Sequence, residues 1–201
     1  MIGILVAARQ PMVRRGLVAS LDGEADLRVV AEVGDGEAVV PAALEHGPDT
    51  AIVDLDLPGA DGFTVALGLR ENTPDCRVLL LSQRPRPGLV RRAFAVHALG
   101  FMSLDASPEQ LADGVRLVAA GRRAVDPELV VAALEASDNP LTRREMEVLR
   151  LAAQGARSNE IAEQLFLSVG TVRNHLSRIM CKTQARSRLD AVRIASDSGW
   201  L

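Results

Sequence analysis

Five apolar runs alternate with five amphipathic stretches over the first 120 residues, and this alternation constrains the fold more than any other feature. Apolar runs bounded by turn residues predict strands, and apolar residues at helical spacing predict helices. Five such units with short connections favour an α/β fold with a five-stranded, doubly wound parallel sheet. The expected strands are Ile2–Ala7, Leu27–Val33, Thr50–Val53, Arg77–Leu81 and Gly100–Ser103, and the expected helices are Pro11–Leu21, Gly36–His46, Gly62–Asn72, Pro87–Ala98 and Pro108–Ala120.

The remaining residues predict a second, smaller domain that is all-α. Thr142 and Glu145 have the spacing of a capping box, in which each residue bonds the other's backbone N–H at a helix start. We expect a first domain over 1–121, a linker with a short helix (Glu128 to Glu135) over 122–139, and a four-helix domain over 140–201. The four expected helices are Arg143–Gln154, Asn159–Leu165, Val169–Lys182 and Ser187–Ser198.

The third of these helices has two unlike faces. Val172, Leu176 and Ile179 fall on one side, where the preceding helix can pack against them, and Ser168 can cap the helix start. The other side has polar side chains that suit base edges and phosphates in a DNA major groove, namely Arg173, Asn174, Ser177 and Arg178. On periodicity alone, an ordinary solvated face on a helix pair is the favoured interpretation of this pattern.

The distribution of charge favours the nucleic-acid interpretation. The whole chain has a formal net charge of −3, which argues against DNA binding. Residues 1–137, however, hold 13 arginines and 19 acidic residues, net −6, whereas residues 138–201 hold 10 basic and 7 acidic residues, net +3. The positive part is the one that contains the two-faced helix, as a contact with DNA requires.

The motifs of the C-terminal part identify it more closely. From Leu141 to about Gly199 the chain contains LT-x-RE-x-EVL, NEIA, LFLS-x-GTV-x-NH and RSR-x-x-AV. These segments resemble the LuxR-type DNA-binding domain of NarL/FixJ response regulators. The resemblance implies double-stranded DNA as the partner, a homodimer, base contacts from Arg173, Asn174 and Ser177, and phosphate contacts from Thr171, Arg178 and Lys182.

The third expected strand is followed by a second motif. Asp54 stands at the strand end, with Pro58 four residues later and Asp61-Gly62 at seven and eight. With the order of the elements, this resembles the phosphoacceptor segment of response-regulator receiver domains over Ile2 to Ala120. The resemblance implies that Asp54 corresponds to the phosphorylated aspartate, Ser82 to the switch hydroxyl and Phe101 to the switch aromatic.

Three positions depart from the receiver pattern. Ala8 and Arg9 stand where receivers have an acidic pair, and Leu104 stands where they have a lysine. Mg²⁺ prefers carboxylate oxygens, and phosphoryl transfer needs metal and cationic groups to neutralise charge. We therefore expect no metal site and no cofactor, with Mg²⁺ binding doubtful, and a regulator without enzymatic activity whose receiver is not switched by Mg²⁺-dependent phosphorylation.

The role of Arg9 has two interpretations. Its guanidinium can form a two-pronged ion pair with Asp54 or Asp56, which would fix the receiver in one state. Alternatively, Arg9 points to solvent, as most arginines do.

Two other functions remain open on the sequence alone. One is a conventional two-component response regulator that a histidine kinase phosphorylates on Asp54. The other is an interaction module that inhibits a partner regulator by pairing with it. The absence of a span of ~20 apolar residues predicts no membrane contact, and the widely spaced Cys76 and Cys181 favour a reducing, cytoplasmic setting.

Overall fold

The computed structural model describes residues 1–127, 129–131 and 139–201. The chain divides into two compact units, one made of residues 1–85 and 90–131 and the other mainly of residues 139–201, and each is described separately below. The short helix expected from Glu128 to Glu135 falls largely outside the described residues.

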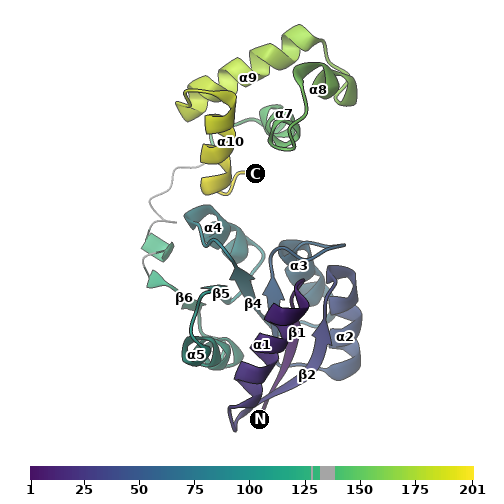
Figure 1. Ribbon diagram of the computed structural model, residues 1–201, viewed down its shortest axis with the longest axis vertical. Coiled ribbons are helices and arrows are strands. Elements are labelled where there is room, and N and C mark those ends of the chain that lie inside the picture. Colours follow the sequence, from purple (N-terminus) through teal and green to yellow (C-terminus); the bar gives the residue numbers. More distant parts are fainter. Residues whose placement is uncertain (128, 132–138) are drawn as a thin grey trace. The chain divides into compact units, whose positions relative to one another are not determined.

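A parallel sheet of six strands forms the centre of the first unit, in the order β2-β1-β3-β4-β5-β6 (Figure 1). The prediction of a parallel α/β sheet is confirmed, but the expected number of five strands is wrong. The sixth strand has only two residues, too few to show any periodicity, and it lies in the segment expected to be linker. The strands are β1 (Ile2–Ala7), β2 (Leu27–Val33), β3 (Thr50–Asp54), β4 (Arg77–Ser82), β5 (Gly100–Ser103) and β6 (Ala124–Val125).

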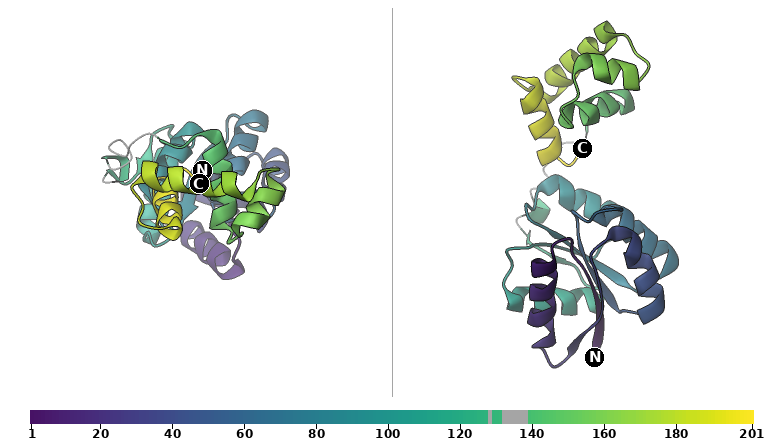
Figure 2. Two further views of the ribbon diagram at one scale, coloured as in Figure 1. Left: turned by 90° about the horizontal axis from the view of Figure 1, so that it is seen from above. Right: turned by 45° about the vertical axis from the view of Figure 1, so that its right-hand side comes forward.

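Helices cover both faces of this sheet, with α1 and α5 side by side on one face and α2 and α3 on the other (Figures 1 and 2). Helix α4 ends earlier than expected because His97 adopts a left-handed backbone with φ of 63°, and Ala98 then donates its N–H to the Ala93 carbonyl. The helical elements are α1 (Pro11–Asp22), the 3-10 turn η1 (Gly36–Ala38), α2 (Val39–His46), α3 (Gly62–Asn72), α4 (Pro87–Ala95) and α5 (Pro108–Ala119).

An apolar core fills the space between the sheet and the face covered by α1 and α5. Because alternate residues of a strand face the same side, β1 and β4 each contribute a pair of side chains to it. The buried residues include Ile4, Val6, Ile52, Leu79 and Leu81 of the strands and Leu21, Leu111, Val115 and Val118 of the helices.

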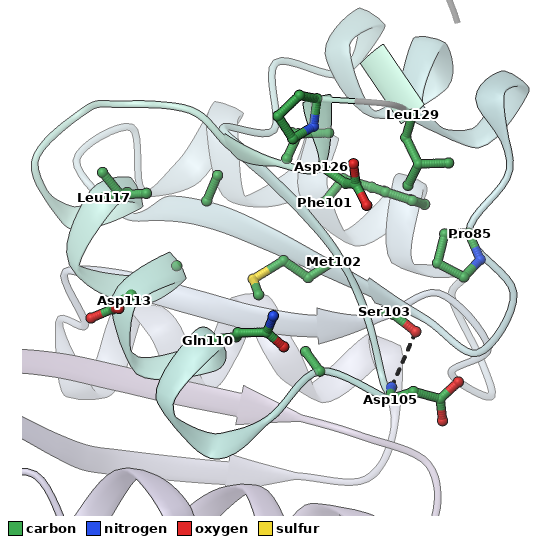
Figure 3. A pocket seen from close by; sticks show the side chains of 15 residues that line it. Pro85, Phe101, Met102, Ser103, Asp105, Gln110, Asp113, Leu117, Asp126 and Leu129 are labelled. Atoms are coloured by element: carbon green, nitrogen blue, oxygen red, sulfur yellow. Dashed lines mark hydrogen bonds between the residues drawn. The ribbon is translucent and has the colours of Figure 1, made fainter. Parts of the chain in front are cut away.

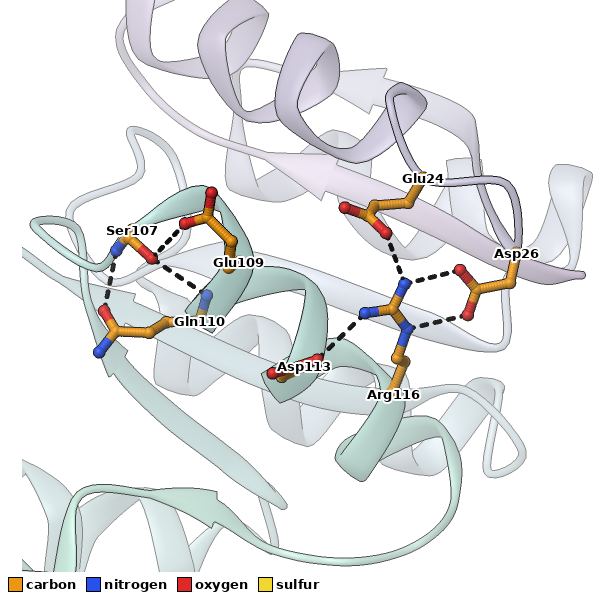
Figure 4. Close-up of polar contacts among 7 residues, drawn as sticks. All are labelled: Glu24, Asp26, Ser107, Glu109, Gln110, Asp113 and Arg116. Carbon is orange, nitrogen blue, oxygen red and sulfur yellow. Dashed lines mark hydrogen bonds and ion pairs between the residues drawn. The ribbon is translucent and has the colours of Figure 1, made fainter.

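Polar contacts fix both ends of α5 (Figure 4). At its start, Ser107 donates its N–H to Gln110 Oε1 at 2.9 Å and its hydroxyl accepts the Gln110 N–H at 3.3 Å, which together form a capping box. Near its end, the Arg116 guanidinium bonds Asp26 at 2.7 and 2.9 Å and Glu24 at 2.7 Å. The hydrogen bond from Arg116 lowers the pKa of Asp26 to about 2. Asp26 is therefore ionised at neutral pH, and its ion pair with Arg116 connects α5 to the segment before β2.

The second unit consists, over its described residues, of α7 (Arg143–Ala153), α8 (Ser158–Gln164), α9 (Val169–Thr183) and α10 (Arg188–Asp197). Each helix buries one apolar stripe in a shared core. Fully buried members of that core are Val148, Leu149, Ile161, Val172, Ile179 and Ala195. In the part of the chain that the structure covers, none of the helices combines the length and the apolar character that a membrane crossing needs.

Candidate functional site

Helix α9 has the two faces that its sequence predicts. Val172 and Ile179 are fully buried and Leu176 nearly so, against α7 and α8. Arg173, Asn174, Ser177 and Arg178, on the opposite side, are all exposed. The four side chains offer hydrogen-bond donors and acceptors over less than two turns of one helix, which is the arrangement that a groove-reading helix needs.

The turn before α9 sets where this face begins. Ser168 is the N-cap, and its hydroxyl accepts the Thr171 N–H at 3.0 Å, as predicted. The Thr171 hydroxyl lies 2.9 Å from the same Ser168 oxygen. Phe166 reverses the chain direction with a φ of 54° and leaves its side chain 96% exposed. A phenylalanine in the left-handed region is uncommon, and the sequence contains no glycine that would have marked this position.

Two arginines that the sequence analysis did not single out fix the helices around α9. Arg144 of α7 donates to the Leu165 carbonyl at 2.6 Å, just before the turn. Arg188 of α10 donates to the Ala156 carbonyl at 2.6 Å and to the Ala152 carbonyl at 3.0 Å. These bonds go to carbonyl groups at or just after the ends of α8 and α7. Long-range side-chain to backbone bonds have no sequence pattern that would have revealed them.

Lys182 occupies the C-terminal end of α9 and has a partner within the domain. Its ammonium lies 2.7 Å from Glu145 Oε2, and the Glu145 side chain is only 4% exposed. Burial raises the pKa of the Glu145 carboxyl, but the hydrogen bonds from Lys182 and Thr142 outweigh burial and leave that pKa below its usual value. Lys182 therefore positions α9 against α7, a role that its exposed, basic character did not indicate.

In the first unit, Asp54 ends β3 and is 6% exposed. Its Oδ1 accepts the Asp56 N–H at 3.0 Å. Burial raises the pKa of the Asp54 carboxyl, and the backbone N–H of Asp56 counteracts part of that rise. Ser82 ends the neighbouring strand β4, is equally buried, and accepts the Arg84 N–H at 3.2 Å.

The motif residues after Asp54 have structural roles of their own. Asp61 caps α3 by accepting the Thr64 N–H at 2.7 Å. A Cβ on Gly62 would lie 2.8 Å from the Asp54 carbonyl oxygen, so only glycine fits so close to the end of β3. The Asp-Gly pair therefore sets the distance between α3 and the strand that carries Asp54.

A hollow of about 370 Å³ lies beside Asp54 at the carboxyl end of the sheet. It brings together Arg9, Asp54, Asp56 and Asp61, whereas Ala8, Ser82, Phe101 and Leu104 do not line it. Ala8 and Phe101 are fully buried, and Leu104 packs partly buried against the sheet core.

These residues do not suit Mg²⁺. Ala8 has no side-chain oxygen, and Arg9 brings a positive charge to the place where a carboxylate ligand would be needed. Within the described ranges, no group of three or more His, Cys, Asp or Glu side chains is arranged to hold a metal ion. Leu104 offers no cation to a phosphoryl group either.

The Arg9 side chain is exposed, and over the described residues it forms no ion pair within 4.0 Å with Asp54, Asp56 or Asp61. Asp61 instead lies 3.6 Å from Arg92 of α4. The direct Arg9–Asp54 or Arg9–Asp56 ion pair is therefore not present in this structure. Against the rise that burial causes, however, the backbone N–H and the positive charge of Arg9 both lower the pKa of the Asp54 carboxyl, so Arg9 lies close enough to act on it.

Comparison with known proteins covers both units. Residues 4–116 match the response regulator receiver domain, and residues 139–195 match the bacterial regulatory proteins of the luxR family. The transcriptional regulatory protein YvfU of Bacillus subtilis is 37% identical over 100% of both chains, and the response regulator RamR of Streptomyces coelicolor is 38% identical over 100% of this chain and 98% of its own. The two-component response regulator RcsB in complex with DNA superimposes with a TM-score of 0.69 at 25% identity, over 98% of each chain.

The two matched families account for both units, and the relatives align along the full length of the chain. The chain belongs to the response regulators that join a receiver domain to a LuxR-type helix-turn-helix domain, and it is a DNA-binding transcriptional regulator of the two-component type.

Proposed function

We propose that this protein binds specific DNA sequences as a homodimer through α9, and that its receiver is not switched by Mg²⁺-dependent phosphorylation of Asp54. The observation that carries the first part is the exposed polar face of α9 opposite a fully buried apolar face. A surface helix needs no such clustering of Arg, Asn and Ser for folding, whereas major-groove readout does.

The polar residues of α9 have proposed roles that follow from their chemistry. Arg173 can bond two acceptors of a guanine edge, and Asn174 can bond an adenine edge in the same two-pronged way. Ser177 lies one turn further along the same face. Arg178 and Thr171 flank these residues and suit phosphate oxygens, which position a protein on DNA without reading sequence.

Lys182 remains a candidate for a phosphate contact in spite of its bond to Glu145. An ammonium has three donors, and Glu145 takes one of them. The Lys182 side chain is 36% exposed, so its other donors can reach an oxygen outside the domain.

A dimer is proposed because one small domain with a single reading helix makes too few base contacts for a specific site. Two copies would read two half-sites about one helical turn apart, roughly 34 Å. RcsB, which resembles this chain over its full length, has been observed as dimers bound to DNA.

The receiver part of the proposal rests on three residues. Ala8 and Arg9 remove the carboxylates that would hold Mg²⁺, and Leu104 removes the cation that would neutralise a phosphoryl oxygen. A conventional phosphorylated regulator is the second candidate, and the buried pair of strand ends at Asp54 and Ser82 is the observation that favours it.

One experiment tests both parts: genome-wide capture of bound DNA with the wild-type protein and an Asp54→Asn variant side by side. We expect a limited set of sites with a shared half-site sequence, occupied equally by both proteins. Capture without sequence enrichment would refute α9 as a reading helix. Loss of sites in Asp54→Asn, together with a phosphate-dependent band shift of the wild type after acetyl phosphate and Mg²⁺, would establish the conventional mechanism instead.

A further inference from the structure

Gly170 lies in the first turn of α9, where packing does not require a glycine. In α5 packing does require one, because a Cβ on residue 114 would collide with the sulfur of Met102, whose side chain extends from β5 toward α5 (Figure 3). For a Cβ on Gly170, the nearest atom among the described residues, outside its chain neighbours and its own helix backbone, is the Ser168 hydroxyl oxygen at 3.7 Å. This is an ordinary contact distance, so alanine would fit at position 170 without any movement of its surroundings.

The backbone at Gly170 does not require a glycine either. The residue lies within the regular helix α9, outside the left-handed region that Gly47 and Gly155 adopt. Within a helix, glycine lowers stability relative to alanine because its backbone loses more conformational freedom on folding. Glycine therefore makes α9 less stable than alanine would, and neither packing nor backbone geometry accounts for its presence.

The position of Gly170 on α9 points to DNA binding as the reason. Residues four and seven positions apart lie on the same side of a helix, so Gly170 shares its side with Asn174 and Ser177. It is exposed, and it lies opposite Val172 and Ile179, which are fully buried. Gly170 is therefore in line with residues that are proposed to contact bases.

We propose that Gly170 is a positioning residue for DNA binding, because its missing side chain allows the base edges of the major groove to come directly against the backbone of α9. This close approach would set how deep the helix lies in the groove. The inference rests on the proposed use of α9 as the reading helix. It adds a residue that makes no hydrogen bond through a side chain and yet determines whether its neighbours can make theirs.

The proposal distinguishes base contacts from phosphate contacts. Hydrogen bonds need donor and acceptor within about 3.2 Å of each other. A methyl group at position 170 would hold α9 away from the bases, so that Arg173 and Asn174 could no longer reach them at this distance. Contacts with phosphates lie at the edges of the groove and do not depend on the depth of the helix, so binding to unrelated DNA should persist.

The test measures folding and DNA binding of the full-length Gly170→Ala variant. Trp200 is the single tryptophan of the chain and packs against the core of the second unit, so its fluorescence in urea reports the stability of that unit. We expect the urea midpoint to stay equal or to rise, because alanine favours the helix. A loss of DNA affinity in the same variant would then have no explanation in the fold.

DNA affinity is measured by fluorescence anisotropy with two duplexes at one salt concentration. One has the sequence most enriched in the genome-wide capture, and the other has the same base composition in scrambled order. We expect Gly170→Ala to bind the enriched duplex about tenfold or more weakly than the wild type does, as the loss of a base contact implies. Affinity for the scrambled duplex should change by less than about twofold.

Two further glycine variants sharpen the comparison. Gly16→Ala is the matched control, because Gly16 is an exposed glycine of α1 with open space around its Cβ position. It should change neither the urea midpoint reported by Trp200 nor the affinity for either duplex. Gly170→Leu introduces a larger side chain that also favours helices, and it should weaken binding to the enriched duplex more than Gly170→Ala does.

Arg173→Ala in the same assay separates this inference from the proposed function. Unchanged affinity of Gly170→Ala for the enriched duplex, together with a loss in Arg173→Ala, would overturn the role of Gly170 and leave α9 as the reading helix. An equal loss on both duplexes, or a lower urea midpoint in Gly170→Ala, would also overturn it. If Arg173→Ala loses no affinity, α9 is not the reading helix, and the inference fails with the proposed function.

Discussion

The Lys182 ammonium and the Glu145 carboxylate lie 2.7 Å apart, and they join the C-terminal end of α9 to the first turn of α7. Glu145 also accepts the Thr142 N–H at 2.7 Å and the Thr142 hydroxyl at 2.9 Å. One buried carboxylate thus caps a helix and holds a second helix in place.

Breaking this pair from the lysine side should destabilise the C-terminal domain. Lys182→Met keeps the apolar stem but leaves a buried carboxylate without its cation, and we expect a loss of about 1–3 kcal/mol in the free energy of unfolding. Chemical denaturation measures it. Glu145→Gln/Lys182→Met should recover most of the loss, because glutamine can still complete the capping box. A double variant as unstable as the single one would contradict this account.

The Lys182–Glu145 pair also predicts that the stability of the fold depends on pH. The pKa of Glu145 is lower in the folded protein than its ordinary value of 4.5, so the bond stabilises the fold above that value and is lost as the pH falls through the lowered pKa. The difference in melting temperature between wild type and Lys182→Met should be widest at neutral pH and should narrow below about pH 4.5. A constant difference down to the acid limit would exclude Glu145 as the cause.

Arg173→Ala tests the reading face. If Arg173 bonds a guanine edge, the variant should lose about 1–3 kcal/mol of binding free energy at the specific site and accept other bases at one position. Footprinting and titration at fixed salt concentration measure both effects. Arg150→Ala, at an exposed position on α7, removes the same charge. It should weaken binding to specific and to non-specific DNA equally, and by less than Arg173→Ala weakens binding to the specific site. Equal effects of the two variants would assign the reading role to another surface.

Asp54→Asn should stabilise the receiver. Burial raises the pKa of the Asp54 carboxyl, so the charged form is disfavoured in the folded protein, whereas asparagine can still accept the Asp56 N–H. The melting temperature should rise by roughly a few degrees at pH 7. Because the folded pKa is raised, the cost of the charge disappears as the pH falls toward 3.8, and the gain should vanish there. Asp75→Asn, an exposed control, should show no such trend.

Millimolar Mg²⁺ should leave the melting temperature of the protein unchanged. A ligand that binds only the folded state raises stability by mass action, and Ala8 and Arg9 leave too few oxygen ligands for such binding. Differential scanning calorimetry with Mg²⁺, and with equal ionic strength of Na⁺ as control, makes the comparison. A saturable rise in Mg²⁺ alone would show that a metal site persists.

Because Arg9 forms no direct ion pair with Asp54, the effects of substituting these two residues on the free energy of unfolding should add. Arg9→Ala and Asp54→Ala should change the free energy of unfolding independently, with a coupling energy below about 0.5 kcal/mol. A larger coupling in the double-mutant cycle would mean that the two side chains meet in solution.

The periodic elements could be predicted from the sequence, and the reasons are local. The strand Thr50–Asp54 has an apolar centre over residues 51–53, and α9 alternates buried and exposed residues at helical spacing, so the pattern of apolar residues predicts both elements. The caps at Thr142 and Ser168 depend on residues three positions apart and could also be predicted from the sequence.

The features that the sequence did not predict are contacts between residues that lie far apart in the chain. Glu145 and Lys182 are 37 positions apart, and nothing in either neighbourhood indicates that they meet. The direction of the Arg9 side chain is set by what surrounds it in three dimensions, so the two interpretations could not be separated beforehand.

The short strand β6 has a practical consequence for anyone who wishes to study the receiver by itself. Ala124 is buried and donates its N–H to the Leu99 carbonyl at 3.0 Å, so it covers part of the outer edge of β5. A receiver fragment that stops at residue 121 would expose that edge to strand pairing between molecules and would tend to precipitate. A fragment that continues to residue 127 retains the cover and should remain in solution.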